Sequence, residues 1–358
     1  MAGYTDVNAP APNSSAGFPT NHLGVRDLLF LNQGNGANGH AKFLEVGVQA
    51  GLESSHFEHG LGAVFSDVNG DGRPDLYVAN DADPNRLYLN EPAAGGLGFR
   101  FVERGRSDGV ADANAGMGIA AADYNGDGLP DLFVSNSRQQ QHGIFRSRAV
   151  GAVGPAFADA RPDFAAAFGS SFAGWGASWV DLNRDGNLDL VLANGDIPIT
   201  KLATDARPAQ VLENLTGQGL AEQFADASKL PGLLDVAGLN GRGLAAADFN
   251  NDGNIDIAIN SIGGPLVLLK NTNRSGHWLE VSLTGFHPNA VVTVVLPDGR
   301  RLVRELQAGS SYLSSEDPRA FFGLGAATTV KTLIVRLPYG SQTRLSDVAG
   351  DRIITVTP

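Results

Sequence analysis

The chain lacks cysteine altogether and has two methionines among its 358 residues. Without cysteine it has no disulfide framework and no thiol chemistry. No apolar run approaches the roughly 18 residues that a membrane-spanning helix needs. The first 17 residues, MAGYTDVNAPAPNSSAG, contain neither the basic stretch nor the apolar core of a signal peptide. These absences exclude a disulfide scaffold, a thiol enzyme and a helical membrane protein.

Long polar runs suited to helices are also few, whereas turn-forming residues are plentiful. The chain contains 46 glycines and 18 prolines. This composition favours many short strands separated by turns, and we therefore predict an all-β fold. The length suffices for a large core and for two domains.

Four copies of one nine-residue loop punctuate the chain, each reading Asp-x-Asn-x-Asp-Gly-x-x-Asp. The spacing gathers oxygen side chains around one point, with a glycine where the chain turns sharply. Ca²⁺ takes six to eight oxygen ligands, whereas Mg²⁺ retains more water. We therefore predict about four Ca²⁺ ions, held by the first, third, fifth and ninth side chains and by the backbone carbonyl of the seventh residue. The predicted ligands are Asp67, Asn69, Asp71, Arg73 and Asp75; Asp123, Asn125, Asp127, Leu129 and Asp131; Asp181, Asn183, Asp185, Asn187 and Asp189; and Asp248, Asn250, Asp252, Asn254 and Asp256.

These loops resemble the first half of an EF-hand but differ at its end. An EF-hand needs a bidentate glutamate at the twelfth position and a helix on each side. The twelfth residues here are Val78, Val134, Leu192 and Ile259, and the flanking segments have the composition of strands. We therefore expect each loop to join two strands. The alternative is four Asp/Asn/Gly turns without metal, which the repeated identical spacing disfavours.

The charge of the chain supports bound cations. Each loop brings three carboxylates close together, and like charges at this separation repel strongly unless they are neutralised. The formal net charge is −12, which equals the charge of the twelve loop aspartates. Four Ca²⁺ ions would add eight positive charges and leave −4. We expect the acidity to reflect metal sites, and nothing indicates a nucleic-acid partner.

The loops belong to a longer repeat. Their first aspartates are 56, 58 and 67 residues apart, a period typical of propeller blades. Seven and five residues before each first aspartate stands a glycine pair: Gly60 and Gly62, Gly116 and Gly118, Gly174 and Gly176, and Gly241 and Gly243. Small residues suit the innermost strands, which crowd towards a propeller axis. The segments 27–33 and 42–52 match the third and fourth strands of a repeat, so we favour five blades, with seven as the alternative.

The repeats resemble the FG-GAP/VCBS family, whose members form calcium-binding β-propellers. The tail, residues 277–358, resembles the ASPIC/UnbV domain through GSSYLSSEDPRAFFGLG (Gly309–Gly325) and VRLPYG (Val335–Gly340). The resemblance implies a propeller over residues 1–275 and a separate C-terminal domain over residues 276–358. Alternating apolar residues around a Pro-Asp-Gly turn predict that this C-terminal domain is a β-sandwich.

Polar and aromatic residues gather at the propeller mouth opposite the metal loops, where we expect a ligand to bind. The candidates for acid–base chemistry are His56, Glu58, His59 and Arg242. The candidates for ligand binding are Trp175, Arg242, Asp81, Asp83, Asn240 and Asp196. The alternatives are a packing role for Trp175, a salt bridge for Arg242 and a polar loop end for the histidines.

Two functions fit this sequence. The first is a calcium-stabilised, non-catalytic binding or adhesion module, to which the resemblance to integrin-type propellers points. Its partner would be a protein, a glycan or a small molecule. The second is a propeller enzyme, either lyase- or dehydratase-like or a UnbV-type accessory of natural-product biosynthesis. Weak calcium loops fill only where calcium is plentiful, so we expect a secreted or periplasmic protein whose leader has been removed.

Overall fold

The structure is a computed structural model. It describes residues 19, 22–36, 39–52, 57–148, 154, 156–164, 168–197, 199, 201–217, 223–228, 238–307 and 309–358. The fold is all-β, as the composition predicts, and the two α-helices among the described residues, α1 (Gly47–Ala50) and α2 (Arg161–Phe164), are single turns.

Four antiparallel sheets follow one another along the chain, each with its strands in sequence order. The first contains β3 (Gly60–Ser66), β4 (Asp75–Asn80), β5 (Arg86–Pro92) and β6 (Phe99–Glu103). The second contains β7 (Gly116–Ala122), β8 (Asp131–Asn136), β9 (Gly143–Ser147) and β10 (Phe157–Asp159). The third contains β11 (Gly174–Val180), β12 (Asp189–Asn194), β13 (Gln210–Asn214) and β14 (Phe224–Asp226). The fourth, as far as the structure describes it, contains β15 (Gly241–Ala247), β16 (Asp256–Ser261) and β17 (Val267–Leu269).

Each predicted metal loop joins the first and second strands of its sheet. In the first sheet Ser66 pairs with Asp75 across the loop, and the matching residues pair in the other three sheets. The second strands β4, β8 and β12 are buried along their whole length. The β-branched and aromatic residues after each ninth-position aspartate therefore form the middle of each sheet.

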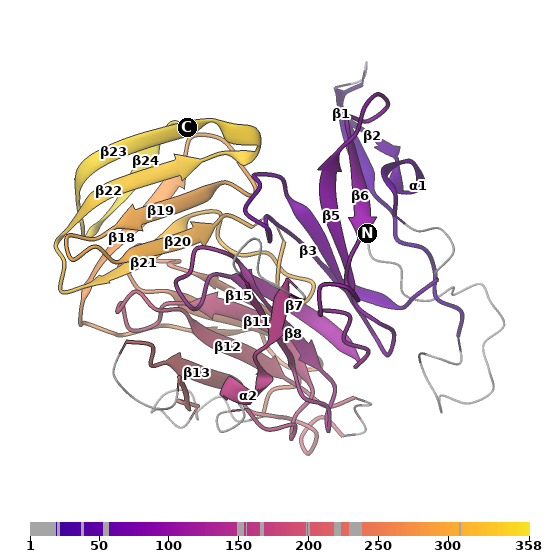
Figure 1. The fold of residues 1–358 in the computed structure, drawn as a ribbon. Coiled ribbons are helices and arrows are strands. Elements are labelled where there is room, and N and C mark those ends of the chain that lie inside the picture. The colour runs from indigo at the N-terminus through magenta and orange to yellow at the C-terminus, as the bar shows by residue number, and fades with distance from the viewer. Residues whose placement is uncertain are drawn as a thin grey trace.

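The inner strands β3, β7, β11 and β15 lie side by side in that order (Figure 1). The second glycine of each pair permits this close approach. A Cβ atom on Gly62 would lie 2.5 Å from the carbonyl oxygen of Met117, and one on Gly118 would lie 2.1 Å from that of Trp175. At Gly176 the nearest atom is the amide nitrogen of Leu244, at 2.5 Å. The glycine of one sheet thus packs against the inner strand of the next, as expected for blades around an axis.

The five-bladed ring expected from the sequence is not confirmed, because the sheets do not close in the described part of the chain. A Cβ atom on Gly243 of β15 would meet the Ser314 hydroxyl at 2.8 Å, not the strand of another blade. The N-terminal strands β1 (Phe30–Asn35) and β2 (Ala41–Glu45) form a two-stranded sheet of their own beside the first blade (Figure 1). A segment of the C-terminal domain therefore takes the place next to the fourth blade.

The C-terminal domain consists of two sheets. One contains β18 (His277–Leu283), β21 (Ala320–Gly325) and β24 (Arg352–Val356); the other contains β19 (Val291–Val295), β20 (Arg301–Glu305), β22 (Thr329–Arg336) and β23 (Gln342–Ala349). Their inner faces share one core of valine, leucine and phenylalanine side chains, including Val281, Val294 and Phe322. Two sheets that enclose a single apolar layer form a β-sandwich. This core includes no buried residue of the four blades.

We predict that Gly118→Ala destabilises the fold, because the added methyl group would overlap the backbone of the neighbouring blade. Overpacking of this kind costs about 1–3 kcal/mol of unfolding free energy. Gly309→Ala is the matched control, since a Cβ atom there meets nothing within 4 Å. Denaturant unfolding of both variants tests the prediction, and equal midpoints would contradict it.

Candidate functional site

All twenty residues predicted as metal ligands lie in the described part of the chain, in four loops of one geometry. In the first loop the Asn69 side-chain oxygen accepts a hydrogen bond from the Asp71 amide at 3.0 Å, and Asp71 Oδ1 accepts one from the Arg73 amide at 2.9 Å. Asp67 Oδ2 accepts the Gly72 amide at 2.9 Å. The same bonds recur at the matching positions of the other loops. The side-chain oxygens are thus turned towards the inside of each loop.

The sixth-position glycine allows this turn. Gly72, Gly128, Gly186 and Gly253 have φ angles of 86°, 95°, 95° and 79°. Residues with a Cβ atom seldom adopt this left-handed region, whereas glycine does so without strain. The sequence therefore needs glycine at this position for the loop to close.

The ninth-position aspartates connect each loop to the third strand of its blade. Asp75 Oδ1 accepts the Asn90 amide at 2.8 Å, and Asp75 Oδ2 accepts the Val68 amide at 3.2 Å. Asp131 is held in the same way by Ser147 and Tyr124. Burial, with a smaller contribution from neighbouring loop carboxylates, raises the pKa of Asp75 and of Asp131 to about 8. Without a cation these groups therefore bind protons near neutral pH.

The first-position aspartates are also buried. Burial raises the pKa of Asp123 and of Asp181 to about 6, with a smaller contribution from the nearby carboxylates Asp127 and Asp185. At Asp181 the Arg304 guanidinium opposes this shift.

Two observations indicate that the loop residues suit a hard cation such as Ca²⁺. Three buried carboxylate oxygens, Asp67 Oδ1, Asp181 Oδ1 and Asp256 Oδ2, have no hydrogen-bond partner among the described residues. The other atoms that could bind the metal are carboxylate, side-chain amide and backbone carbonyl oxygens, which suit Ca²⁺. Among the described residues no three histidine or acidic side chains converge closely enough to hold a metal by themselves. A bound ion would therefore share asparagine and backbone oxygens with the carboxylates.

The predicted acid–base cluster at the mouth is divided between separate partners. The Glu58 carboxylate accepts hydrogen bonds from Arg86 at 2.5 Å and from Asn80 at 3.0 Å. His59 Nδ1 lies 2.6 Å from Asp83 Oδ2 and is buried. His56 lies outside the described residues. Glu58 and His59 thus contact different partners, and they do not form one acid–base centre.

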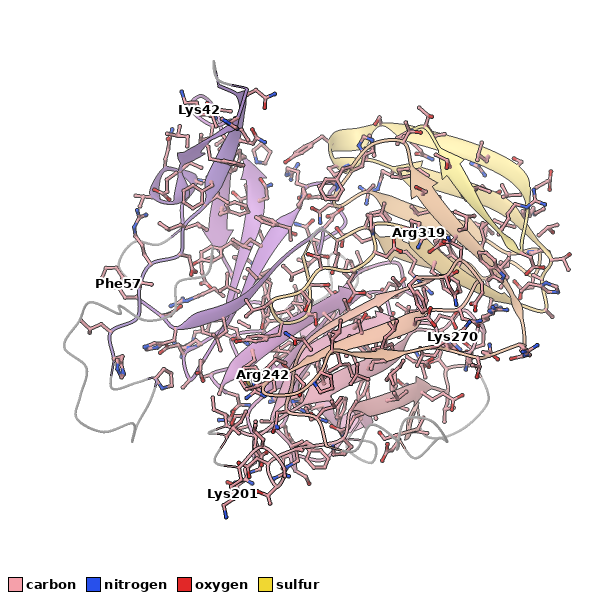
Figure 2. The ribbon with its side chains drawn as sticks, turned by 180° about the vertical axis from the view of Figure 1, so that it is seen from behind. Lys42, Phe57, Lys201, Arg242, Lys270 and Arg319 are labelled. Carbon is pink, nitrogen blue, oxygen red and sulfur yellow. The ribbon has the colours of Figure 1, made fainter. Side chains whose placement is uncertain are left out.

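Trp175, Asp196, Asn240 and Arg242 do come together, between the third and fourth blades. The Arg242 guanidinium lies over the Trp175 ring, 3.9 Å from its centroid, and donates a hydrogen bond to the Asp196 carbonyl at 3.0 Å. Figure 2 shows Arg242 among the strands of the repeats, away from Arg319 of the C-terminal domain. Burial lowers the pKa of Arg242 to about 10. Asn240 is buried beside these residues, and the Asp196 carboxylate pairs with Arg207. Asp81 forms a bridge with Ala115 at the neighbouring blade.

A residue that sequence reasoning missed, Tyr312, covers this group. Its ring lies edge-on to Trp175, with the centroids 4.9 Å apart. The neighbouring Ser311 pairs with Ile119 of β7 through two backbone hydrogen bonds, of 2.5 and 3.1 Å. The aromatic ring on which a ligand could stack is thus in contact with side chains of the chain itself. Tyr312 lies in the Gly309–Gly325 segment. The sequence indicated that this segment belongs to the C-terminal domain, but not where the segment docks.

Comparison with known proteins agrees with this geometry. Residues 67–134, which span the first two metal loops, match the FG-GAP-like repeat, and residues 286–358 match the family described as ASPIC and UnbV. The chain contains an FG-GAP-like repeat and an ASPIC and UnbV domain.

The curated relatives carry one name. Cartilage acidic protein 1 of Homo sapiens is 27% identical over 300 residues, which cover 78% of this chain and 41% of the relative. The Mus musculus protein of that name is 29% identical over 173 residues, covering 48% of this chain and 25% of the relative. The chain thus spans less than half the length of these relatives. The BP39L lectin from Burkholderia pseudomallei is a solved structure with 12% identity and a TM-score of 0.34, covering 91% of this chain and 97% of the lectin, a likeness too loose to bear on function.

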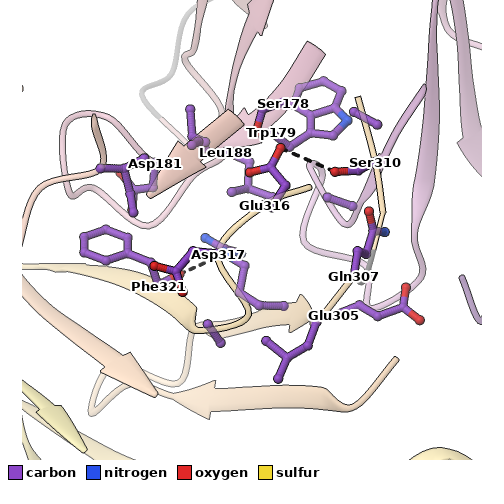
Figure 3. A pocket seen from close by; sticks show the side chains of 18 of the residues that line it. Ser178, Trp179, Asp181, Leu188, Glu305, Gln307, Ser310, Glu316, Asp317 and Phe321 are labelled. Atoms are coloured by element: carbon purple, nitrogen blue, oxygen red, sulfur yellow. Dashed lines mark hydrogen bonds between the residues drawn. The ribbon is translucent and has the colours of Figure 1, made fainter. Parts of the chain in front are cut away.

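The ASPIC and UnbV domain borders a cavity of about 120 Å³ against the inner strands β7, β11 and β15 (Figure 3). Glu280, Glu305 and Glu316 line it, and burial raises their pKa to about 8, 7 and 7. Arg319 donates to Glu280 at 2.7 Å and to the Asp248 carbonyl of the fourth loop at 2.9 Å. The described interface between the repeats and the ASPIC and UnbV domain is therefore lined by buried carboxylates, and Arg319 connects the two parts through the Asp248 carbonyl.

The described residues contain no helix with the length and apolarity that crossing a bilayer would require.

We predict that the metal-free protein becomes more stable as the pH falls from about 8.5 to 6.5. The pKa of Asp75 and of Asp131 is about 8 in the folded state, far above the ordinary value of about 4. In this window the folded state therefore binds more protons than the unfolded state, so the free energy of unfolding rises as the pH falls. Below about 6.5 the buried His142, whose pKa burial lowers to about 4, begins to act in the opposite direction.

Denaturant unfolding in excess chelator at pH 8.5 and 6.5 measures this effect, and the expected gain is about 1 kcal/mol or more. With excess calcium the protein should instead be more stable at pH 8.5 than at pH 6.5, because protons then compete with the ion for the same carboxylates. If the protein in chelator is more stable at pH 8.5 than at pH 6.5, the prediction that Asp75 and Asp131 bind protons in this range is wrong.

Proposed function

We propose that the protein is a calcium-stabilised binding module in which each of the four loops holds one Ca²⁺ ion. The observation that carries the proposal is the fourfold recurrence of one loop geometry around buried carboxylates, three of which leave an oxygen without a partner in the described chain. The ion would neutralise these carboxylates and fix the loop between the first two strands of a blade. Loops of this kind fill where calcium is plentiful, which supports a secreted or periplasmic location.

The groups that an enzyme would use at the mouth are held in internal pairs, which supports binding over catalysis. Glu58 is paired with Arg86, His59 with Asp83, and Arg242 lies over Trp175. We therefore place the partner on the outer rim of this mouth. Ile197, Leu202 and Ile262 are 52%, 47% and 47% exposed there. Exposed apolar side chains close together are typical of a surface that binds another protein.

The calcium proposal is tested by counting ions and by melting the protein with and without chelator. The full chain should bind about four Ca²⁺ ions, and chelation should lower the melting temperature by roughly three to five degrees, about what two to four kcal/mol produce in a chain of this size. A protein that binds no calcium at millimolar concentrations, or whose melting is unchanged by chelator, would contradict the proposal.

We predict that Asp127→Asn removes one ion from the count, because it weakens the charge of a single loop and leaves the others intact. Asp127 is the exposed fifth residue of the second loop. Asp347→Asn, an exposed carboxylate on β23 of the C-terminal domain, makes the same change in net charge and is the control. The proposal fails if both variants bind as many ions as the original chain.

A further inference from the structure

The four loops share one sequence pattern but differ in what contacts the first aspartate. In the second loop both oxygens of Asp123 bond to amides of the loop itself, and Asp248 does the same in the fourth. In the first and third loops the ASPIC and UnbV domain adds a donor. Arg336 Nη2 donates to Asp67 Oδ2 at 3.0 Å, and the Gly323 amide donates to Asp181 Oδ2 at 3.0 Å. The first and third loops are therefore the two whose first carboxylate accepts a hydrogen bond from the domain, whereas at the fourth loop Arg319 donates to the Asp248 carbonyl and to Asn251 Oδ1.

The donor at the first loop is charged, and the donor at the third is not. Asp67 is 5% exposed, whereas the Arg336 side chain is 34% exposed and reaches the carboxylate from the end of β22. A Cβ atom on Gly72, the turn residue of this loop, would lie 3.1 Å from Arg336 Nη1. The guanidinium thus lies directly against the loop that would enclose the ion.

Other contacts hold the same part of the domain on the loop. The Tyr339 amide donates to the Gly72 carbonyl at 2.9 Å, and the Asp67 amide donates to Glu305 Oε1 at 3.1 Å. Arg336 and Tyr339 both belong to Val335–Gly340, one of the two signature segments of the tail. This segment therefore docks on the first loop together with Glu305 of β20.

A guanidinium on a metal-ligand carboxylate opposes metal binding in two ways. It occupies one of the oxygens, and its positive charge repels a divalent cation that would bind a few ångströms away. When the metal is absent, the same guanidinium compensates a buried carboxylate that would otherwise be costly. The Gly323 amide at the third loop has no net charge, and the nearby Arg304 guanidinium donates to carbonyl oxygens, not to the Asp181 carboxylate.

Cations also pair with fifth-position aspartates, Arg73 with Asp71 in the first loop and Lys270 with Asp252 in the fourth. These carboxylates are 29% and 34% exposed, so solvent screens both pairs more than it screens the buried Asp67 pair.

We propose that Arg336 is an internal counter-ion that competes with calcium for Asp67 and makes the first loop the weakest of the four sites. This inference rests on the calcium-binding function proposed above. It makes the first loop the place where calcium loading and the docking of the ASPIC and UnbV domain are coupled.

The first test is calcium titration of the full chain by calorimetry after chelator treatment. Arg336→Gln should tighten the weakest site roughly three- to tenfold, as expected when one nearby charge is removed. Arg336→Lys keeps the charge and should stay within about twofold of the original chain. Lys331→Gln, an exposed residue five positions before Arg336 and roughly 16 Å along the same strand, loses the same charge away from the loop and should also stay within about twofold.

The second test separates competition from a merely structural role. Arg336→Gln should lower the denaturant midpoint in chelator, because Asp67 loses its counter-ion, and this deficit should vanish or reverse in excess calcium. An arginine with only a packing role would leave the variant equally destabilised in both conditions. If the variant unfolds in chelator, affinity is measured from the calcium-loaded protein by competition with a chelator of known affinity.

Unchanged or weaker calcium binding by Arg336→Gln, or a deficit that calcium does not relieve, overturns this inference. If the original chain binds about four ions and the variant behaves identically, the function proposed above survives and only the role of Arg336 fails. If the original chain binds no calcium, both fail.

Discussion

The structure depends on carboxylates that are buried where each loop meets its blade. The ninth-position aspartates accept amides from the loop and from the third strand, so one side chain connects three segments of each blade. Burying a carboxylate is costly unless it is protonated, hydrogen-bonded or bound to a cation. The chain has four such sites, each with further carboxylates close by. Binding of a divalent ion at each site would offset the cost of burying these carboxylates. If the loops hold calcium as proposed, the stability of the blades would respond to calcium as well as to pH.

The ASPIC and UnbV domain completes this system. Its Val335–Gly340 segment docks on the first metal loop, and the Gly309–Gly325 segment runs along the inner strands and ends at the third loop. A Cβ atom on Gly323 would lie 2.1 Å from Asp181 Oδ2, so this position in the segment needs glycine to approach the loop. Beside the fourth blade, Ser314 lies where the strand of a further blade would pack. The two segments that identify the tail by sequence thus help to attach it to the repeats, together with Arg304, Glu305 and Gln307.

Much of the fold could be predicted from the sequence because the repeat carries local and periodic signals. The glycine pairs indicated the close approach of inner strands, which Gly118 and Trp175 display directly. The Asp-Gly loops indicated a turn between two strands, and the positive φ of Gly72 confirms that turn. These features depend on short stretches of chain, and short stretches suffice to predict them.

The position of the C-terminal domain beside the blades and the contacts at the mouth could not be predicted, because both depend on segments far apart in sequence. Ser311 pairs with Ile119, and Tyr312 lies against Trp175, across more than 130 residues. The pattern around His56, Glu58 and His59 indicated one cluster, but the choice of Arg86 and Asp83 as partners depends on how neighbouring strands are placed. The first and second loops follow the same sequence pattern. They differ because Arg336 of the docked domain donates to Asp67 in the first loop, which the loop sequence alone does not indicate.

Anomalous scattering from calcium-loaded crystals tests the central claim most directly. The account predicts a peak in each of the four loops, surrounded by the side-chain oxygens of the first, third, fifth and ninth residues and the carbonyl of the seventh. Loops without density for an ion in crystals grown with millimolar calcium would contradict it.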